Sequence, residues 1–235
     1  MRPVGFSAVM AHRVSTPDDL DYFPTPPWAA RAGGELVRGI DPKPGLMCWE
    51  PACGGGHMAW GLGDYFAAVQ VTDIFDHAET GLDTGDFLDP GFAPGLNADW
   101  IVTNPPFVKG EAFVRRAWAR ASRGVAMLLR LQFLEGGARY RMFADLPLHT
   151  VAPFAERVPM VKGRWDPEAS SATAYAWFIW IKPGVPGFGD APRLSIIAPG
   201  ARDRLSRPED LTRFTAMAEA PLFDALANPS TPEGA

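Results

Sequence analysis

The chain has 235 residues, a hydrophobic content of 47% and a formal net charge of −5. It is long enough for one ordinary globular domain and a short appendage, and no run of about 18 apolar residues predicts a membrane span. The opening stretch "MRPVGFSAVMAHRV" has no long apolar core, so we expect no signal peptide. Two cysteines, Cys48 and Cys53, are too few for a disulfide framework or a zinc site, which favours the cytoplasm and no bound metal.

Charge is distributed unevenly along the chain. Residues 1–107 carry 5 basic and 14 acidic side chains, whereas residues 108–220 carry 17 basic and 11 acidic ones. A basic half can attract a polyanion even when the whole protein is acidic, so the pattern is compatible with a nucleic-acid partner. An arginine-rich composition imposed by a GC-rich genome would produce the same counts.

Hydrophobic periodicity predicts alternating strands and helices. Short apolar runs bounded by turn residues predict strands at 45–50, 67–74, 98–104, 124–131, 150–160 and 173–182. Amphipathic spacing predicts helices at 57–66, 110–122 and 137–146. This alternation indicates an α/β fold with a mostly parallel sheet and helices on both faces, and the closing pair of strands predicts an antiparallel strand at one end. Beyond about residue 200 we expect a peripheral helix and a frayed end.

A glycine-rich loop, "WEPACGGGHM" (49–58), joins the first predicted strand to the first predicted helix. Glycines are needed where a chain turns tightly from strand to helix and lets a ligand approach the backbone. The loop is not a dinucleotide fingerprint, because Gly54 and Gly56 are followed by Ala59, and no Gly-Lys-Ser/Thr of a phosphate-binding loop occurs. Glu50 would repel a phosphate and would suit a ligand with hydroxyl or ammonium groups.

Two further stretches could complete a nucleoside site. Asp73 ends the second predicted strand, where a carboxylate can accept hydrogen bonds from ribose hydroxyls. In "TGDFLDP" (84–90), Asp86 could accept from an exocyclic amine while Phe87 packs on a purine. Taken alone, Asp73 could equally cap a surface turn, and Phe87 could be an ordinary core residue.

Three motifs, "YFPTPPW" (22–28), "EPACGGGH" (50–57) and "NPPF" (104–107), occur in that order. Their order and spacing resemble the S-adenosylmethionine-dependent amino-methyltransferases, especially the DNA adenine-N6 methyltransferases, over residues 22 to about 182. The resemblance implies a Rossmann-like class I methyltransferase fold with a seven-stranded sheet. It also implies methyl transfer from S-adenosylmethionine to the 6-amino group of adenine in double-stranded DNA, bound by the basic C-terminal half.

The resemblance divides the chain and assigns its site residues. The predicted parts are an N-terminal extension (1–21), a catalytic domain (22–188) and a short C-terminal appendage (189–235). The residues assigned to the cofactor are Thr25, Glu50, Ala52, Gly54, Gly56, Asp73, Asp86, Phe87 and Asn104. Within this set, Thr25 and the glycine loop would hold the methionine portion and Glu50 its ammonium group. Asp73 would bind the ribose, and Asp86 and Phe87 would bind the adenine.

The "NPPF" motif answers a chemical difficulty, because an aromatic amine is a poor nucleophile whose lone pair is delocalised into the ring. The side-chain carbonyl of Asn104 and the backbone carbonyl of Pro105 can accept the two N–H bonds and favour a tetrahedral nitrogen. The prolines fix φ and remove local donors, so these carbonyls stay aimed at the site, with Pro106 on the substrate side. Phe107 would stack on the base, which must leave the duplex to be reached. Asn104, Pro105 and Phe107 are therefore the predicted catalytic residues.

A basic and aromatic stretch follows the fifth predicted strand. Lys162, Arg164 and Trp165 combine charges for phosphate contact with a ring for base stacking, so we predict that they bind substrate. Only about fifty residues follow the last predicted strand, whereas larger enzymes of this type append a long recognition domain. Adenine in RNA, a protein glutamine amide and a non-catalytic cofactor-binding module therefore remain alternatives, and the oligomeric state is left open.

Overall fold

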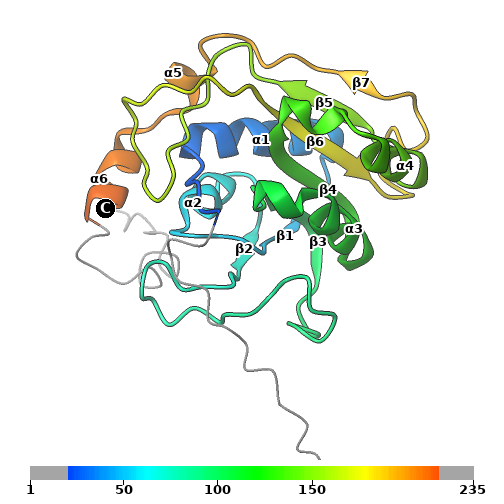
Figure 1. Cartoon of the computed structure of the whole chain (residues 1–235), viewed down its shortest axis with the longest axis horizontal. Coiled ribbons are helices and arrows are strands. Elements are labelled where there is room, and N and C mark those ends of the chain that lie inside the picture. The colour runs from blue at the N-terminus through cyan, green and yellow to red at the C-terminus, as the bar shows by residue number, and fades with distance from the viewer. Residues whose placement is uncertain (1–20, 217–235) are drawn as a thin grey trace, which may run out of the picture.

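Helices cover both faces of a seven-stranded sheet in the computed structural model, which describes residues 21–216 (Figure 1). The strands are β1 (Met47–Glu50), β2 (Ala68–Val71), β3 (Ala98–Thr103), β4 (Ala121–Arg130), β5 (Thr150–Pro153), β6 (Tyr175–Ile181) and β7 (Arg193–Leu194). Their order across the sheet is β2-β1-β3-β4-β6-β5-β7. All neighbours are parallel except β6, which runs antiparallel to both β4 and β5.

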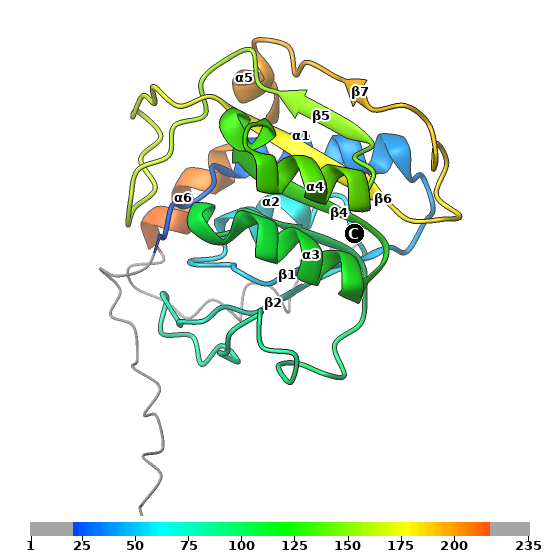
Figure 2. The same cartoon turned by 45° about the vertical axis from the view of Figure 1, so that its right-hand side comes forward.

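Two hydrophobic clusters lie one on each face of the sheet, and the helices cover both faces (Figure 2). The helices are α1 (Pro27–Ile40), α2 (His57–Leu62), α3 (Gly110–Arg120), α4 (Gly137–Asp145), α5 (Ala201–Leu205) and α6 (Pro208–Ala216), with 3-10 turns η2 (Phe107–Lys109) and η3 (Leu131–Leu134). In β3, Trp100 and Val102 pack with α1, α2 and α5, whereas Ile101 packs with α3 and α4. This period of two is what a strand buried on both faces requires, and it confirms the predicted α/β layers.

The position of the antiparallel strand differs from the sequence-based prediction. We expected it at one end of the sheet, but β6 lies between β4 and β5. All seven residues of β6 are buried, so this strand needs a neighbour on each side and helices on each face. The seventh strand, β7, is a short parallel addition to β5 from the tail of the chain. The predicted division at residue 188 remains a prediction.

The first helix, α1, was not predicted because its sequence contains two adjacent glycines, which disfavour helix interiors. Packing explains them. A Cβ on Gly33 would lie 2.4 Å from the Trp177 ring, and one on Gly34 would lie 2.4 Å from the Tyr65 ring. The two glycines lower the intrinsic helix propensity of α1, but they allow two aromatic rings to approach its backbone.

The tail helices are fixed to α1 by a buried ion pair. Arg31 on α1 is 1% exposed and donates to both carboxylate oxygens of Asp210, each at 2.7 Å. It also donates to Asp64 at 2.6 Å and to the Leu205 carbonyl at 2.9 Å. The indole N–H of Trp60 donates to Asp210 at 2.9 Å. All three nitrogens of this buried guanidinium make hydrogen bonds. Helices α5 and α6 are therefore attached to the domain.

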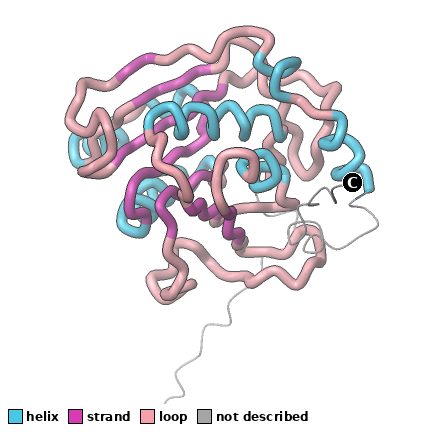
Figure 3. Tube along the Cα trace, turned by 180° about the vertical axis from the view of Figure 1, so that it is seen from behind, coloured by secondary structure: helices cyan, strands magenta, loops and turns pink. Residues whose placement is uncertain are grey.

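One peripheral helix was expected after residue 200, and two short helices, α5 and α6, are present there. The predicted frayed end and most of the N-terminal extension lie outside residues 21–216. No helix within the described part of the chain is long and apolar enough to cross a membrane. Figure 3 shows how much of the chain is loop, and these loops supply most of the residues discussed below.

We expect Asp210→Ala to destabilise the protein by about 3 kcal/mol, because it leaves the Arg31 charge buried without its main partner. Burial opposes ionisation of Asp210, but the hydrogen bonds from Arg31 dominate and hold the pKa of Asp210 below its ordinary value. Its stabilisation is therefore present above the unfolded pKa and is lost as the pH falls through the folded pKa. Urea unfolding at pH 7 and at pH 3 measures both effects.

The matched control is Asp190→Ala, which removes an exposed partner of Arg193 and should cost under about 1 kcal/mol. Equal losses in the two variants would show that the buried pair does not hold the tail helices.

Candidate functional site

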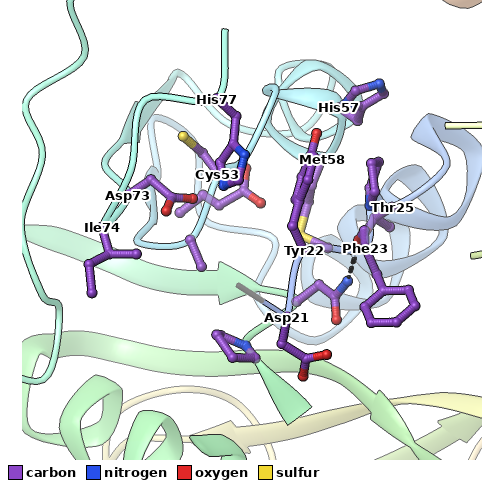
Figure 4. Close-up of a pocket in the computed structure, with 15 residues that line it drawn as sticks. Asp21, Tyr22, Phe23, Thr25, Cys53, His57, Met58, Asp73, Ile74 and His77 are labelled. Carbon is purple, nitrogen blue, oxygen red and sulfur yellow. Dashed lines mark hydrogen bonds between the residues drawn. The ribbon is translucent and has the colours of Figure 1, made fainter. Parts of the chain in front are cut away.

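A cavity opens where β1, β2 and β3 end, at the carboxyl edge of the sheet (Figure 4). Its lining comes from four separate segments of the chain. It comprises Asp21, Tyr22, Phe23, Pro24, Thr25, Glu50, Ala52, Cys53, His57, Met58, Asp73, Ile74, His77, Asn104 and Pro106. Ligands of open α/β sheets bind at this edge, so the cavity is the candidate site.

The glycine loop forms one wall of the cavity and is held by a carboxylate. Gly54 has φ 52° and Gly56 has φ 78°, a left-handed conformation that favours glycine and lets α2 begin at once. The backbone N–H of Gly54 donates to Asp73 at 2.7 Å, and the N–H of Phe75 donates to the other oxygen of Asp73 at 3.1 Å. Asp73 thus fixes the glycine loop to the end of β2.

Two buried carboxylates make this part of the cavity acidic. Glu50 is 1% exposed, and one of its oxygens has no hydrogen-bond partner within residues 21–216. Burial, with repulsion from Asp73, raises the pKa of Glu50 well above its ordinary value. Burial also raises the pKa of Asp73, although the N–H groups of Gly54 and Phe75 oppose this. The described lining contains no Lys or Arg, so the cavity is suited to a cationic ligand.

Asn104 presents an acceptor whose orientation is fixed. Its side-chain Nδ2 donates to the Phe23 carbonyl and to the Thr25 hydroxyl, both at 3.0 Å. A backbone carbonyl can only accept, so Nδ2 must face Phe23 and the side-chain oxygen must face the other way. That oxygen is buried and has no partner among the described residues. An unpaired buried acceptor is costly unless a ligand donates to it.

The turn after Asn104 is held from both sides. The N–H of Phe107 donates to Asp21 at 2.8 Å, and the N–H of Lys109 donates to the Pro106 carbonyl at 2.9 Å. Together with the fixed proline φ angles, these bonds limit the ways in which the motif can move. The sequence indicated the rigid turn but not its partner Asp21, which lies 86 positions earlier in the chain.

Tyr22 lies directly over the glycine loop, which the sequence did not predict. Its hydroxyl accepts from the Gly55 N–H at 3.0 Å, and a Cβ on Gly54 would lie 2.2 Å from its ring. The ring stacks on His77 at a centroid distance of 4.1 Å. Burial raises the pKa of the Tyr22 hydroxyl, so it stays protonated at neutral pH. A ligand on this loop therefore has to share or replace the Tyr22 hydroxyl.

Most of the predicted cofactor residues are gathered at the cavity, but two are not. Thr25, Glu50, Ala52, Asp73, Asn104 and the substrate residue Pro106 line it, and Gly54 and Gly56 shape its glycine loop. Phe87 is 2% exposed, with ring centroids 5.1 Å from Trp49 and 5.0 Å from Phe113. Asp86 accepts from the Leu88 N–H in its own turn. Neither lines the cavity, and their assignment to an adenine stays a prediction without a contact to support it.

The predicted substrate stretch approaches the cavity through its backbone. Its Gly163 N–H donates to the Tyr22 carbonyl at 2.9 Å, in a tight turn where Val161 bridges Arg164. Arg164 pairs with Asp166 at 3.1 Å. Lys162 lies in the same turn. The substrate roles of Lys162 and Arg164 remain predictions.

Trp165 is placed against the tail of the chain. Its ring centroid lies 5.9 Å from His57 and 5.8 Å from Phe214 of α6, and Phe214 stacks on His57 at 3.9 Å. Burial, with a smaller contribution from Arg213, lowers the pKa of His57 to about 3, so the ring is neutral at pH 7. Of these three rings, His57 lines the cavity, whereas Trp165 and Phe214 pack against His57 from outside the lining.

Comparison with known proteins gives a match in structure but not in sequence. No family model matches the chain, and no curated protein matches it. It is similar to a type I restriction-modification methyltransferase subunit from Streptococcus thermophilus, with a TM-score of 0.55 and 13% identity over 83% of this chain. The chain covers 53% of that protein, about half its length.

Two further solved structures are similar. One is a putative class I S-adenosylmethionine-dependent methyltransferase from Listeria monocytogenes, with a TM-score of 0.53 and 10% identity over 88% of this chain and 73% of that one. The other is a putative RNA methyltransferase from Pyrococcus horikoshii, with a TM-score of 0.50 and 15% identity over 69% of this chain and 88% of that one. At these identities the likeness establishes the fold. The chain has the Rossmann-like fold of the class I S-adenosylmethionine-dependent methyltransferases.

Proposed function

We propose that the protein transfers a methyl group from S-adenosylmethionine to the 6-amino group of adenine in DNA. The observation that carries this proposal is the buried Asn104 side-chain oxygen, which has no partner within the described chain and whose direction is set by Phe23 and Thr25. An acceptor in this state suits a donor with N–H bonds. With the Pro105 carbonyl as a second acceptor, it would hold both N–H bonds of an exocyclic amine.

The cavity residues fit the cofactor. S-adenosylmethionine supplies an activated methyl group on a sulfonium centre, and it also carries an ammonium group. Glu50 and Asp73 are buried carboxylates with no Lys or Arg beside them in the described lining, and one Glu50 oxygen lacks a partner. A cationic ligand would relieve the cost of burying these charges. We assign the ammonium to Glu50 and the ribose hydroxyls to Asp73, beside the glycine loop.

Catalysis in this arrangement is chiefly positioning. Asn104 and Pro105 would favour a tetrahedral amine with its lone pair directed at the methyl donor, and holding two reactants in line removes much of the entropic barrier. Asn104 is well suited to this because its amide cannot rotate without losing two hydrogen bonds. After transfer, the methylated nitrogen carries one extra proton, and solvent can accept it.

DNA is our proposed acceptor, supported by motif order and by the likeness to a restriction-modification methyltransferase subunit. The charge asymmetry supports it less than the residue counts suggest. On α3, Arg116 donates to the carbonyls of Phe87, Asp89 and Pro90, and Arg120 donates to those of Phe92, Ala93 and Leu96. These charges hold the 87–96 loop. The cations free to meet a phosphate backbone are therefore fewer than the sequence indicates.

Nucleoside mass spectrometry tests the proposal after incubation of the protein and S-adenosylmethionine with unmethylated genomic DNA or with total RNA. We expect N6-methyladenine in DNA. Asn104→Ala should reduce this activity by a factor of about 10³ or more, because the amine loses an oriented acceptor. Calorimetry should show cofactor affinity within a few fold of the wild type.

If methyladenine appeared in RNA alone, the proposed mechanism would stand and the substrate would be RNA instead of DNA. Equal losses of activity and cofactor affinity in Asn104→Ala would contradict the role given to Asn104, because the variant would then have damaged the cavity as a whole.

Glu50→Gln should stabilise the empty protein at pH 7 by about 1 kcal/mol while weakening cofactor binding about tenfold. Because burial raises the folded pKa of Glu50, its carboxylate destabilises the fold progressively as the pH rises above the unfolded pKa of about 4.3. The gain of the variant should therefore vanish below about pH 4.

Thermal unfolding without cofactor at pH 7 and pH 4 measures the change in stability. Calorimetry of S-adenosylmethionine binding measures the change in cofactor affinity. Glu35→Gln, at an exposed ion pair with Arg204, is the control and should change neither by much. A variant that is less stable and binds as well as the wild type would remove Glu50 from the site.

Tyr22→Phe should bind S-adenosylmethionine a few fold more tightly than the wild type. The Tyr22 hydroxyl occupies the Gly55 N–H, which is a backbone donor suited to the cofactor carboxylate, and Phe cannot compete for it. Calorimetry measures the change, with Tyr65→Phe on the far side of α1 as the control. Weaker binding would instead make the Tyr22 hydroxyl a ligand of the cofactor.

A further inference from the structure

Phe107, which the proposed function assigns to the target base, is covered by a cation in this structure. The Arg130 guanidinium carbon lies 4.4 Å from the centroid of the Phe107 ring. The other aromatic neighbours, Phe23 and Tyr175, are tilted to Phe107 by 44° and 35°, with centroids 5.5 and 5.8 Å away. Phe107 is therefore packed by aromatic rings at its sides and stacked by Arg130.

Arg130 lies where its side chain could contact the base that accepts the methyl group. It is the last residue of β4, at the same edge of the sheet where β3 leads into Asn104, and its side chain is exposed. It pairs across β4 and β6 with Tyr175, whose ring centroid lies 5.8 Å from that of Phe107. Burial raises the pKa of the Tyr175 hydroxyl, and the neighbouring charge of Arg130 opposes this. Arg130 and Tyr175 therefore lie side by side at Phe107.

Trp165, the second aromatic residue that the sequence assigned to base stacking, lies elsewhere. Trp165 contacts His57 and Phe214 on the α2 side of the cavity. Among the described residues, the planar group that stacks on Phe107 is Arg130. Guanidinium groups stack well on aromatic faces, and their charge strengthens the contact when the site is closed to water.

We propose that Arg130 is a target-base-binding residue that rests on Phe107 until the base arrives and then covers the base from the other side. This assignment rests on the proposed function and names a further group at its acceptor site. A planar base between Phe107 and Arg130 needs a separation of about 7 Å, twice an ordinary carbon contact of about 3.5 Å. Only the exposed arginine has to move outward, since Phe107 is held by Asp21 and by its neighbouring rings.

Three substitutions separate stacking from charge. Arg130→Ala removes both, Arg130→Lys keeps the charge without a planar group, and Arg130→Trp keeps a planar group without the charge. The matched control is Lys182→Ala, because Lys182 Nζ lies 4.1 Å from the Trp118 ring centroid at the opposite end of β4 and β6. Thermal unfolding checks each variant for a loss of folding.

The experiment measures kcat and KM for unmethylated genomic DNA, and the cofactor Kd by calorimetry. We expect kcat/KM to fall about 10- to 100-fold in Arg130→Ala, the range for loss of one base-stacking contact, with the cofactor Kd within about twofold. Arg130→Trp should recover most of the loss and Arg130→Lys little of it. Lys182→Ala should match the wild type.

Recovery by Lys but not by Trp would show a phosphate contact and overturn the assignment, as would an Arg130→Ala variant with wild-type kinetics. A loss of activity that only follows a lower Tm would show a merely structural role. If the wild type methylates no nucleic acid, the proposed function fails and this assignment fails with it. Wild-type methylation with an indifferent Arg130 overturns this assignment alone.

Discussion

The hydrogen bonds of the Asn104 amide connect the parts of the site on which its chemistry depends. Nδ2 reaches the Phe23 carbonyl and the Thr25 hydroxyl, in a segment about eighty positions earlier in the chain. The same two bonds that fix the position of this segment also turn the Asn104 oxygen towards the cavity. If the segment before α1 were displaced, the amide would be free to rotate, and the acceptor would lose its direction.

Residues 21–25 form a segment that crosses the carboxyl edge of the sheet and contacts three of its loops. Asp21 accepts from the Phe107 N–H, the Tyr22 hydroxyl accepts from the Gly55 N–H, and the Tyr22 carbonyl accepts from Gly163. One short segment therefore touches the glycine loop, the Asn-Pro-Pro-Phe turn and the 161–164 turn. The helix that follows this segment, α1, is fixed to α6 by the ion pair of Arg31 and Asp210. The glycine-loop side and the Asn104 side of the cavity are thus connected through α1 and the residues that precede it.

The sequence predicted those features that arise from local pattern. Six of the seven strands and three of the helices follow from periodicity, and the glycine loop and the Asn104 turn follow from residues that have few other uses. It failed where a distant contact decides. Gly33 and Gly34 argue against a helix until the rings of Trp177 and Tyr65 are placed beside them. The sequence left Phe87 open between a core residue and an adenine contact, and the structure packs its ring against Trp49 and Phe113.

The electrostatics of the cavity also depend on distant contacts, and they explain why net charge is a poor guide to the ligand. The arginines of α3 are bound to carbonyls, and Arg31 is bound to carboxylates, so many positive charges are neutralised within the fold. Glu50 and Asp73, by contrast, are buried together without a Lys or Arg in the described lining. Burying these two carboxylates reduces the stability of the empty protein, and a cationic ligand would restore it. Binding and folding are therefore coupled at this cavity.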